Sequence, residues 1–337
     1  MTERQLEVVR IDRGGNRTVM VEEAKELSKF DALLLGADAA SEDEIIEAAK
    51  DADVILTSAA QMTRRVLQAL PKCKAVIRYG IGFDTIDVDA ATDLGILVIN
   101  IPDYCIDEVS NHAITLLLAC ANKLVLLNNM TKEGRWSETY RQMIQPPMGL
   151  IAGQTLGIVG CGNIGRMTGQ KAQCFGLKII GYDPYVDNAL IKACGIKLVT
   201  LPELLKTSDY VSIHTPLNQQ TRHLIGKDEL KQMKTSAYLV NTARGAVVDE
   251  TALIQALQEK LIAGAGLDAF EKEPVDPNNP LLKMENVIVT PHSAYYSDAS
   301  GKRLRTYVGQ EAARVISGRW PKNVVNKSVK PKIPLTK

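Results

Sequence analysis

The run TLGIVGCGNIGRMTGQKAQCFGLKIIGYDP, residues 155–184, decides the fold of this chain. Its first five residues predict a buried strand, and the glycines that follow form a G-x-G-x-x-G motif where a helix begins. A second apolar run predicts another strand, which ends in an acidic residue. This order of strand, glycine turn, helix, strand and acid is typical of a dinucleotide-binding βαβ unit.

Each part of the motif has a physical role in holding a dinucleotide. Gly160 permits the tight turn, Gly162 lets the backbone approach a pyrophosphate, and Gly165 allows close packing of helix on strand. The phosphates would lie at the helix N-terminus, where amide groups attract anions. Asp183 is placed to accept hydrogen bonds from ribose hydroxyls and to repel a 2′-phosphate, so the motif predicts NAD rather than NADP. The alternative is a glycine-rich turn without a ligand.

The composition excludes several classes of function. Among 337 residues there are 40 Lys and Arg and 39 Asp and Glu, so the charge gives no electrostatic basis for binding nucleic acid or an anionic membrane. The N-terminal residues contain no apolar signal region, and the most apolar stretch, 113–127, is interrupted by Asn122 and Lys123, so we expect no membrane span. The six cysteines form no C-x-x-C pair, which indicates reduced thiols in a cytoplasmic protein, most simply as small core residues. We assign no residue to a metal.

The residues before the glycine motif predict a separate α/β domain. Short apolar runs alternate with helical patterns there, which is typical of a parallel sheet covered by helices. We expect strands at 7–11, 32–35, 54–57, 75–77 and 97–99, and helices at 41–50, 63–70 and 87–94. A long apolar helix from about 107 to 132, followed by a turn at Pro146 and Pro147, then leads into the motif.

The residues after the motif continue the alternation. We expect strands at 210–213, 237–240, 263–267 and 287–289, and helices at 202–206, 227–232 and 250–259. With the first two strands they make a doubly wound sheet of six or seven strands, which binds ligands at the carboxyl ends of its strands. The chain closes with an amphipathic helix at 299–317 and a tail of Lys and Pro that we expect to be loosely ordered. We expect these residues to contact the cofactor: Gly160, Gly162, Asn163, Ile164, Gly165, Asp183, His214, Thr215, Pro216, Thr221, Thr242, Ala243 and Asp268.

A nicotinamide enzyme that acts on an alcohol or ketone needs a proton donor and acceptor, and histidine suits this role near neutral pH. His292 ends a strand and is followed by small residues, which favours it. His214 also ends a strand, where backbone contact with the cofactor is the simpler role. His223 has no evident partner, and His112 lies within an apolar helix, where a packing role is the simpler interpretation.

Two further charged residues suit the same chemistry. Glu273 follows the strand that precedes His292, and a carboxylate beside a histidine raises its pKa; the alternative is a solvated surface glutamate. Arg244 follows another strand and is flanked by Gly245, where a guanidinium can bind a carboxylate bidentately; the alternative is a surface salt bridge.

These motifs resemble those of the D-isomer-specific 2-hydroxyacid dehydrogenase family. The similarity runs from GIGFDTID at 80–87, through NTARG at 241–245 and GLD at 266–268, to TPH at 290–292. It implies that the family's catalytic arginine, glutamate and histidine fall on Arg244, Glu273 and His292. It also implies a substrate loop that binds through backbone amides, at Tyr79, Gly80, Ile81 and Gly82.

The resemblance implies an architecture as well. It is an α/β fold of two doubly wound parallel-sheet domains, in which a Rossmann-type NAD-binding domain, 106–296, is inserted into a flavodoxin-like substrate-binding domain made of 1–105 and 297–337. The active site would lie in the cleft between them, with NAD and a small 2-keto or 2-hydroxy acid as partners. By the same analogy we expect a homodimer, joined through the helix at 107–132 and the arm to Pro147.

One branch of the family is especially similar. VIRYGIGFD at 76–84 and HSAYYS at 292–297 resemble the C-terminal binding proteins, corepressors that retain a dehydrogenase site. In that branch an arginine at the position of Arg78 and a tryptophan at that of Tyr295 line the substrate pocket. Two function classes stay open: an enzyme that interconverts a 2-keto acid and a D-2-hydroxy acid, and an NAD(H)-sensing corepressor-like scaffold. The balanced charge and the lack of a long disordered tail favour the enzyme.

Overall fold

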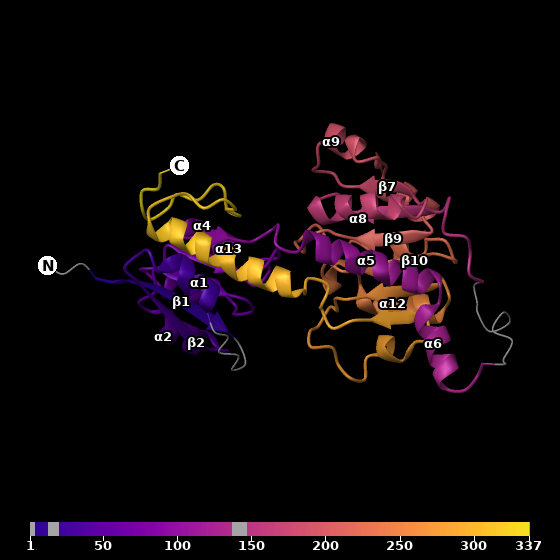
Figure 1. The fold of residues 1–337 in the computed structure, drawn as a ribbon, viewed down its shortest axis with the longest axis horizontal. Helices are drawn as coiled ribbons and strands as arrows, with labels where there is room; N and C mark the ends of the chain where they lie inside the picture. The colour runs from indigo at the N-terminus through magenta and orange to yellow at the C-terminus, as the bar shows by residue number, and fades with distance from the viewer. Residues whose placement is uncertain (1–3, 13–19, 137–146, 337) are drawn as a thin grey trace. The chain divides into compact units, whose positions relative to one another are not determined.

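The chain forms two compact units (Figure 1). The computed structural model describes residues 4–12, 20–136 and 147–336. One unit comprises Met1–Tyr104 and Ser297–Lys337, and the other Cys105–Tyr296. The first boundary lies one residue before the predicted one, and the second lies where it was predicted.

The first unit is a five-stranded parallel sheet in the order β2-β1-β3-β4-β5, the flavodoxin-like order. The strands are β1 (Leu6–Asp12), β2 (Ala32–Asp38), β3 (Val54–Thr57), β4 (Ala75–Arg78) and β5 (Leu97–Ile99). The helices are α1 (Val21–Leu27), α2 (Glu42–Ala49), α3 (Arg64–Gln68), α4 (Val88–Asp93) and α13 (Asp298–Ile316). Ser41, Thr63 and Asp87 accept backbone N–H groups as N-caps, which explains why α2, α3 and α4 begin where they do.

The segment after α13 is ordered, which corrects our expectation of a loose tail. The N–H of Val325 donates to the carbonyl of Val98 at 2.8 Å, and the N–H of Val98 donates to Asn326 Oδ1 at 2.9 Å. Lys332 Nζ donates to two carbonyls of the α3–β4 connection. The tail therefore covers β5, an edge strand whose backbone groups would otherwise face solvent. The tail's composition of Lys and Pro gives no sign of these contacts, because their partners lie more than two hundred residues earlier in the chain.

The second unit is a seven-stranded parallel sheet in the order β12-β11-β10-β9-β6-β7-β8. The strands are β6 (Thr155–Val159), β7 (Lys178–Tyr182), β8 (Lys197–Leu198), β9 (Tyr210–Ile213), β10 (Tyr238–Asn241), β11 (Gly264–Leu267) and β12 (Val287–Val289). The helices are α5 (Ile106–Ala121), α6 (Leu124–Lys132), α8 (Asn163–Gln173), α9 (Asn188–Ala193), α10 (Leu201–Thr207), α11 (Lys227–Leu230) and α12 (Glu250–Gln258). Strand order reverses at β6, between β7 and β9, which is where a Rossmann-type sheet binds its dinucleotide.

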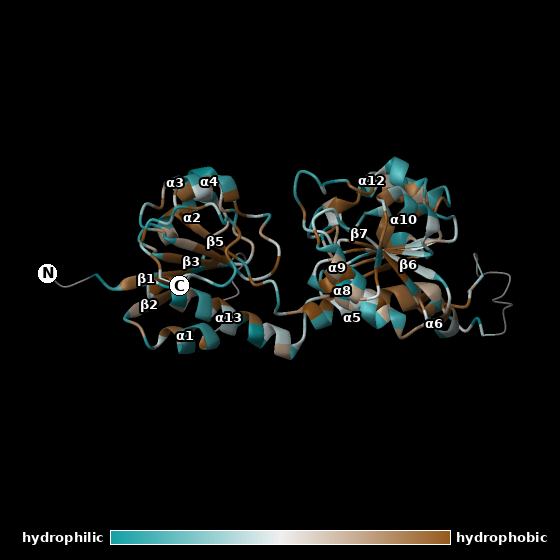
Figure 2. Ribbon diagram, turned by 90° about the horizontal axis from the view of Figure 1, so that it is seen from above, coloured by the Kyte–Doolittle hydropathy of each residue, from teal (hydrophilic) through white to brown (hydrophobic). Residues whose placement is uncertain are grey.

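Two apolar layers enclose this second sheet. One is centred on α10, α11 and α12, and the other on α5, α8 and α9. Figure 2 shows brown, hydrophobic residues along the strands of both sheets, mixed with white, and teal, hydrophilic residues on the helices around them. Since parallel strands are buried on both faces, they appear in the sequence as continuous apolar runs, and that is why those runs located them.

The prediction of one long helix at 107–132 is wrong. The segment is broken into α5 and α6, whose axes meet at 61°. Lys123 at the break has a left-handed φ of 51°. Its ammonium group donates to the hydroxyl of Tyr238 and lies 4.8 Å from the centre of that ring. These contacts hold the bend, and burial lowers the pKa of Lys123. The predicted interface arm to Pro147 falls largely on 137–146, outside the described residues.

No single helix in the described ranges is long and apolar enough to cross a membrane. The bent pair α5 and α6 passes the same test of length and composition when the two are taken together.

Candidate active site

The glycine motif forms the turn between β6 and α8. Gly160 has a φ of 93°, and a Cβ there would lie 2.8 Å from the backbone of His214 and Thr215. A Cβ at Gly165 would lie 2.1 Å from the carbonyl oxygen of Gly160. A Cβ at Gly162 would meet no atom within 4 Å, so this position is open, and α8 begins there without a side-chain cap. Only glycine therefore fits at Gly160 and Gly165 without a clash. The open backbone at Gly162 fits the approach of a pyrophosphate.

Asp183 lies at the carboxyl end of β7, beside this turn. Its Oδ2 accepts the N–H of Cys161 and its Oδ1 accepts the N–H of Tyr185, both at 2.9 Å. Each carboxylate oxygen keeps a further lone pair, so the carboxylate is held in place and can still accept from a pair of ribose hydroxyls.

Two buried hydroxyls lie on the loops that follow β9 and β10. Thr215 Oγ1 and Thr242 Oγ1 have no hydrogen-bond partner among the described residues. Buried polar groups are normally hydrogen-bonded, so a bound ligand could supply the hydrogen-bond partner that each of these hydroxyls lacks within the described ranges. The open glycine turn, the fixed Asp183 and these hydroxyls together fit an NAD-type dinucleotide.

The structure pairs His292 with Glu273. His292 Nδ1 lies 2.7 Å from Glu273 Oε2, and both side chains remain more than one third exposed. Glu273 Oε1 accepts the N–H of Phe270 at 3.0 Å. Burial alone would raise the pKa of Glu273, but these two hydrogen bonds, with the charges of His292 and Arg244, hold it below its usual range. Glu273 is therefore ionised at neutral pH and can support a protonated His292.

Arg244 lies on a rigid loop after β10. The buried side chain of Asn241 holds that loop, since its Nδ2 donates to the carbonyl of Arg244 at 2.9 Å and its Oδ1 accepts the N–H of Ala243 at 3.0 Å. Gly245 packs on the neighbouring loop, where a Cβ would come within 1.8 Å of the Phe270 carbonyl carbon. The charge of Arg244 contributes to the lowered pKa of Glu273. Arg244, Glu273 and His292 are thus brought together at the carboxyl edge of one sheet, although they come from three loops.

Asp268 holds the loop that carries His292, which is a role we did not predict. It is 1% exposed, and its carboxylate accepts the hydroxyl of Thr290 at 2.5 Å and the N–H groups of Ser293 and Ala294 at 2.9 Å. Its carbonyl accepts the N–H of His292, whose φ is 51°. The predicted contact of Asp268 with the cofactor stays a proposal.

His112 belongs to this network, so it is a packing histidine whose ring is satisfied by a hydrogen bond. Its Nε2 lies 2.9 Å from Thr290 Oγ1 and 3.6 Å from Asp268 Oδ1. The sequence shows only a histidine in an apolar helix. Because α5 packs against β11 and β12, the side chain of His112 meets polar groups rather than apolar ones. No local sequence pattern shows how α5 packs.

The two remaining histidines differ in environment. Burial lowers the pKa of His214 to about 4, so its ring is neutral at neutral pH and unsuited to act as the acid. His214 Nε2 lies 2.9 Å from Ser212 Oγ. His223, for which the sequence shows no evident partner, lies with its Nε2 2.7 Å from Glu271 Oε1.

The predicted substrate loop follows β4 in the first unit. The N–H of Tyr79 donates to the carbonyl of Thr57 at 2.8 Å, and its hydroxyl donates to buried Glu23 at 2.7 Å. Tyr79 therefore cannot offer its amide to a substrate in this conformation, which corrects its assignment. The N–H of Gly80 donates to the carbonyl of Arg78. The amides at Ile81 and Gly82 remain the candidates for carboxylate binding.

Two side chains were predicted to line the substrate pocket. The guanidinium of Arg78 donates to the carbonyl of Tyr79 and occupies the space where a side chain at Gly80 would lie. In the other unit, the ring of Tyr295 is partly exposed, and its centre lies 6.4 Å from that of His292. Tyr295 is thus a neighbour of the proposed catalytic histidine.

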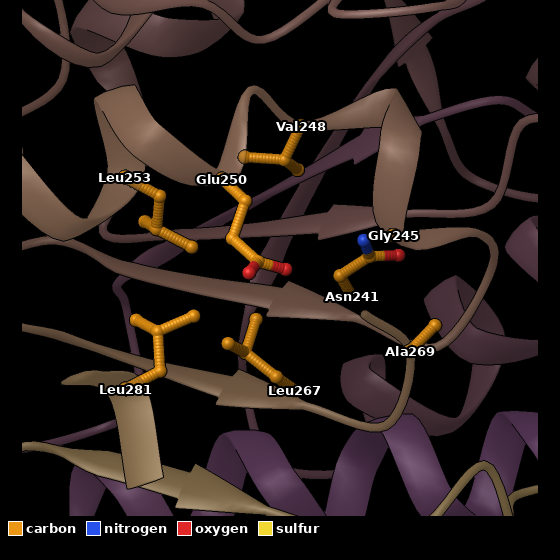
Figure 3. A pocket seen from close by; sticks show the side chains of 8 residues that line it. All are labelled: Asn241, Gly245, Val248, Glu250, Leu253, Leu267, Ala269 and Leu281. Atoms are coloured by element: carbon orange, nitrogen blue, oxygen red, sulfur yellow. The ribbon is translucent and has the colours of Figure 1, made fainter. Parts of the chain in front are cut away.

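A small pocket lies behind the Arg244 loop (Figure 3). It has an empty volume of about 200 Å³ and is lined by Asn241, Gly245, Val248, Glu250, Leu253, Leu267, Ala269 and Leu281. Its walls are mostly aliphatic, with one amide and one carboxylate. Since Arg244, Glu273 and His292 do not line it, it is not the site where a substrate would meet them.

Comparison with known proteins places this geometry in a family. Residues 114–294 match the family described as "D-isomer specific 2-hydroxyacid dehydrogenase, NAD binding domain". A glyoxylate reductase of Korarchaeum cryptofilum is 41% identical over 287 residues, which cover 85% of this chain and 86% of that protein.

Solved structures agree with this match over nearly the whole chain. A D-lactate dehydrogenase from Aquifex aeolicus, complexed with NAD and lactic acid, is similar with a TM-score of 0.82, 29% identity and coverage of 94% and 99% of the two chains. An acyclic imino acid reductase in complex with NADPH and D-Arg has a TM-score of 0.84, 29% identity and coverage of 95% and 100%. These relatives do not confirm the corepressor branch. The chain belongs to the D-isomer-specific 2-hydroxyacid dehydrogenase family, with a Rossmann-type NAD-binding domain.

Proposed function

We propose that this protein is a cytoplasmic enzyme that interconverts a 2-keto acid and the corresponding D-2-hydroxy acid with NAD(H). The observation that carries the proposal is the 2.7 Å pair of His292 and Glu273 beside Arg244, at the same sheet edge as the glycine turn. An ionised carboxylate, an imidazole and a fixed guanidinium are the groups that reduction of a keto acid requires from the protein.

Each residue has a distinct role in this proposal. Arg244 binds the substrate carboxylate through its planar fork, which fixes the position of the carbonyl carbon. His292 gives a proton to the substrate oxygen in reduction and takes it back in oxidation, while Glu273 holds the ring and stabilises its charged form. The bound cofactor supplies or accepts the hydride.

The test is a panel of 2-keto acids offered to the purified protein with NADH. We expect oxidation of NADH with at least one of them, and a hydroxy-acid product of D configuration. Lack of turnover across a panel that includes short, branched, aromatic and dicarboxylic keto acids would reject the proposal.

We predict that NADH is preferred over NADPH by at least about tenfold in kcat/KM. The carboxylate of Asp183 is fixed by Cys161 and Tyr185, so it would face a 2′-phosphate with a charge of the same sign. Steady-state kinetics with NADH and with NADPH measure this preference. The variant Asp183→Ala should have a smaller ratio of the two kcat/KM values, mainly because its activity with NADH is lower. Comparable values in the parent protein would refute the prediction, and the NADPH-bound relative shows that the fold itself permits either outcome.

Glu273→Gln should retain the shape of the pair and remove its charge. The lowered pKa of Glu273 means that it is ionised at neutral pH, so the amide removes a negative charge there. The protonated form of the neighbouring ring then loses its ion pair, and keto-acid reduction should fail at a lower pH than in the parent. The measurement is the pH profile of kcat/KM, and an unchanged alkaline limb would make Glu273 an ordinary surface residue.

We also propose that the protein is a homodimer joined through α6. Leu124 on this helix is 60% exposed, and two more apolar residues in the segments that flank 137–146, Trp136 and Leu150, are 81% and 80% exposed. Figure 1 shows α6 at the periphery of its unit. Large apolar side chains that are this exposed are what a buried interface would cover. Light scattering at micromolar concentration should give twice the chain mass, and the mass of one chain would exclude this dimer.

A further inference from the structure

A second pair of histidine and glutamate lies beside the first. The loop after β11 places two glutamates on alternate residues, and each binds a histidine from a different loop. Glu273 binds His292 at 2.7 Å, and Glu271 binds His223 Nε2 with its Oε1 at 2.7 Å. We call the contact of His223 with Glu271 the outer pair. The proposed mechanism does not use it.

Glu271 is held by more than His223. Its N–H donates to Glu250 Oε2 at 3.0 Å, and its own Oε2 lies 3.4 Å from the N–H of Glu250. Two carboxylates therefore lie close together at the start of α12. The helix N-terminus and a histidine that donates to Glu271 both offset this repulsion. The outer pair thus favours the observed position of Glu271 over one turned away from Glu250.

The backbone of this loop has little room to move toward Arg244. A Cβ at Gly245 would lie within 2.2 Å of Phe270 and of the nitrogen of Glu271, so the two loops pack backbone to backbone. Phe270 in turn donates its N–H to Glu273. A shift at Glu271 is therefore transmitted over two residues to the carboxylate that binds His292.

His223 connects the loop that carries Glu271 to the cofactor loop, by which we mean residues 214–221, where several cofactor contacts are expected. It lies in the connection between β9 and α11, and its φ of 53° directs the chain so that its N–H donates to the carbonyl of Ala246 at 2.9 Å. Thr221, two residues earlier, donates its hydroxyl to the carbonyl of Pro216 at 2.6 Å. The segment that is expected to contact the dinucleotide and the segment that carries Glu273 are thus joined through one side-chain contact.

We propose that His223 is a positioning residue: with Glu271 it fixes the 270–273 loop against the cofactor loop, so that cofactor binding and the alignment of Glu273 with His292 are coupled. This inference rests on the proposed function of Glu273 and His292. The side chains of the outer pair are 40% and 32% exposed, so the pair contributes little to overall stability, and its loss affects alignment rather than folding.

The test compares His223→Ala with His223→Gln, whose side-chain amide can still donate to Glu271. Lys197→Ala is the matched control, because it removes an exposed partner of Glu203 on the same sheet, away from these loops. We expect His223→Ala to lower kcat by about tenfold, to leave KM within about threefold and to leave Tm within about 2 °C. The glutamine variant should recover most of kcat, and the control should match the parent.

Hydrogen exchange of the N–H groups of Phe270 and Glu271 gives a readout that does not depend on turnover. In the parent protein, saturating NADH should slow their exchange, and in His223→Ala exchange should be faster by about fivefold or more and insensitive to NADH. Exchange and kcat equal to the parent in His223→Ala would overturn the proposal. Equal impairment of the alanine and glutamine variants would also overturn it, because donation to Glu271 would then not be the cause. If instead His292→Ala kept full activity, the proposed function would fall while the exchange experiment still tested the outer pair.

Discussion

His292→Ala should lower kcat for keto-acid reduction by about 10²–10⁴. The variant loses the group that gives a proton to the substrate oxygen, and no other described histidine can replace it: His214 is neutral because burial lowers its pKa to about 4, and His112 and His223 bind other partners. Cofactor affinity should stay within about threefold of the parent, since the glycine turn and Asp183 are untouched. Steady-state kinetics and a fluorescence titration with NADH measure the two effects.

His292→Gln is a useful companion to this variant. The amide can donate a hydrogen bond to Glu273 but cannot exchange a proton, so it should be impaired nearly as strongly as the alanine variant. A loss of less than about tenfold in kcat with either substitution would show that the proton comes from another group. A large loss of NADH affinity would show that the substitution disturbs the cofactor site.

Arg244→Lys should lower kcat/KM by at least about two powers of ten with every 2-keto acid, a loss of roughly 3 kcal/mol in transition-state binding. Lysine keeps the charge but loses the planar fork, and a point charge on a flexible stem cannot orient the carboxylate in the same way. The loop itself should stay in place, because Asn241 and Gly245 hold it through backbone contacts. Thermal unfolding at an unchanged temperature would confirm that the variant is folded.

Arg78→Ala should differ from Arg244→Lys, which is expected to affect every 2-keto acid. Arg78 belongs to the other unit, where its guanidinium lies against its own loop, and we expect its loss to depend on the substrate. Keto acids with a second anionic or polar group should be affected most. If Arg78→Ala and Arg244→Lys lowered activity by one common factor across the panel, the division of roles would be wrong.

The sequence predicted the two sheets well because parallel strands are buried on both faces. Runs such as 54–57 and 97–99 coincide with β3 and β5, and the glycine motif located the βαβ unit. Among the α-helices and strands of the described residues, α1, β8 and α9 were missed. Each has seven residues or fewer, and a short element has too few positions to show a periodicity.

The bend between α5 and α6 was missed for a different reason. Asn122 and Lys123 interrupt the apolar stretch only briefly, and apolar residues resume at Leu124, so the pattern alone shows no bend. The bend is held by the contact of Lys123 with Tyr238, which begins β10 more than a hundred residues later. The order of the tail has the same origin, since Asn326 bonds with the backbone of β5. Long-range contacts of this kind leave no local pattern in the sequence.

In the candidate site, too, some residues could be predicted from the sequence and some of their contacts could not. Arg244, Glu273 and His292 could be named because each follows a strand, and parallel strands end at one edge of the sheet. The partners of His112 and His223 could not be named. His112 acts through the packing of α5 on the sheet, and His223 through a backbone turn with positive φ. The amide of Tyr79 was assigned wrongly because its position in the ladder with β3 cannot be seen in a motif.

The central claim is direct hydride transfer to C2 of a 2-keto acid with D stereochemistry, and one measurement tests it most directly. The protein is incubated with NADH carrying deuterium at C4 and with the best prochiral keto acid of the panel, and the product is examined by chiral chromatography and mass spectrometry. We predict a D-2-hydroxy acid with one deuterium at C2 when the transferring face of the cofactor is labelled. An L product, or a hydroxy acid without deuterium from either labelled face, would contradict the account.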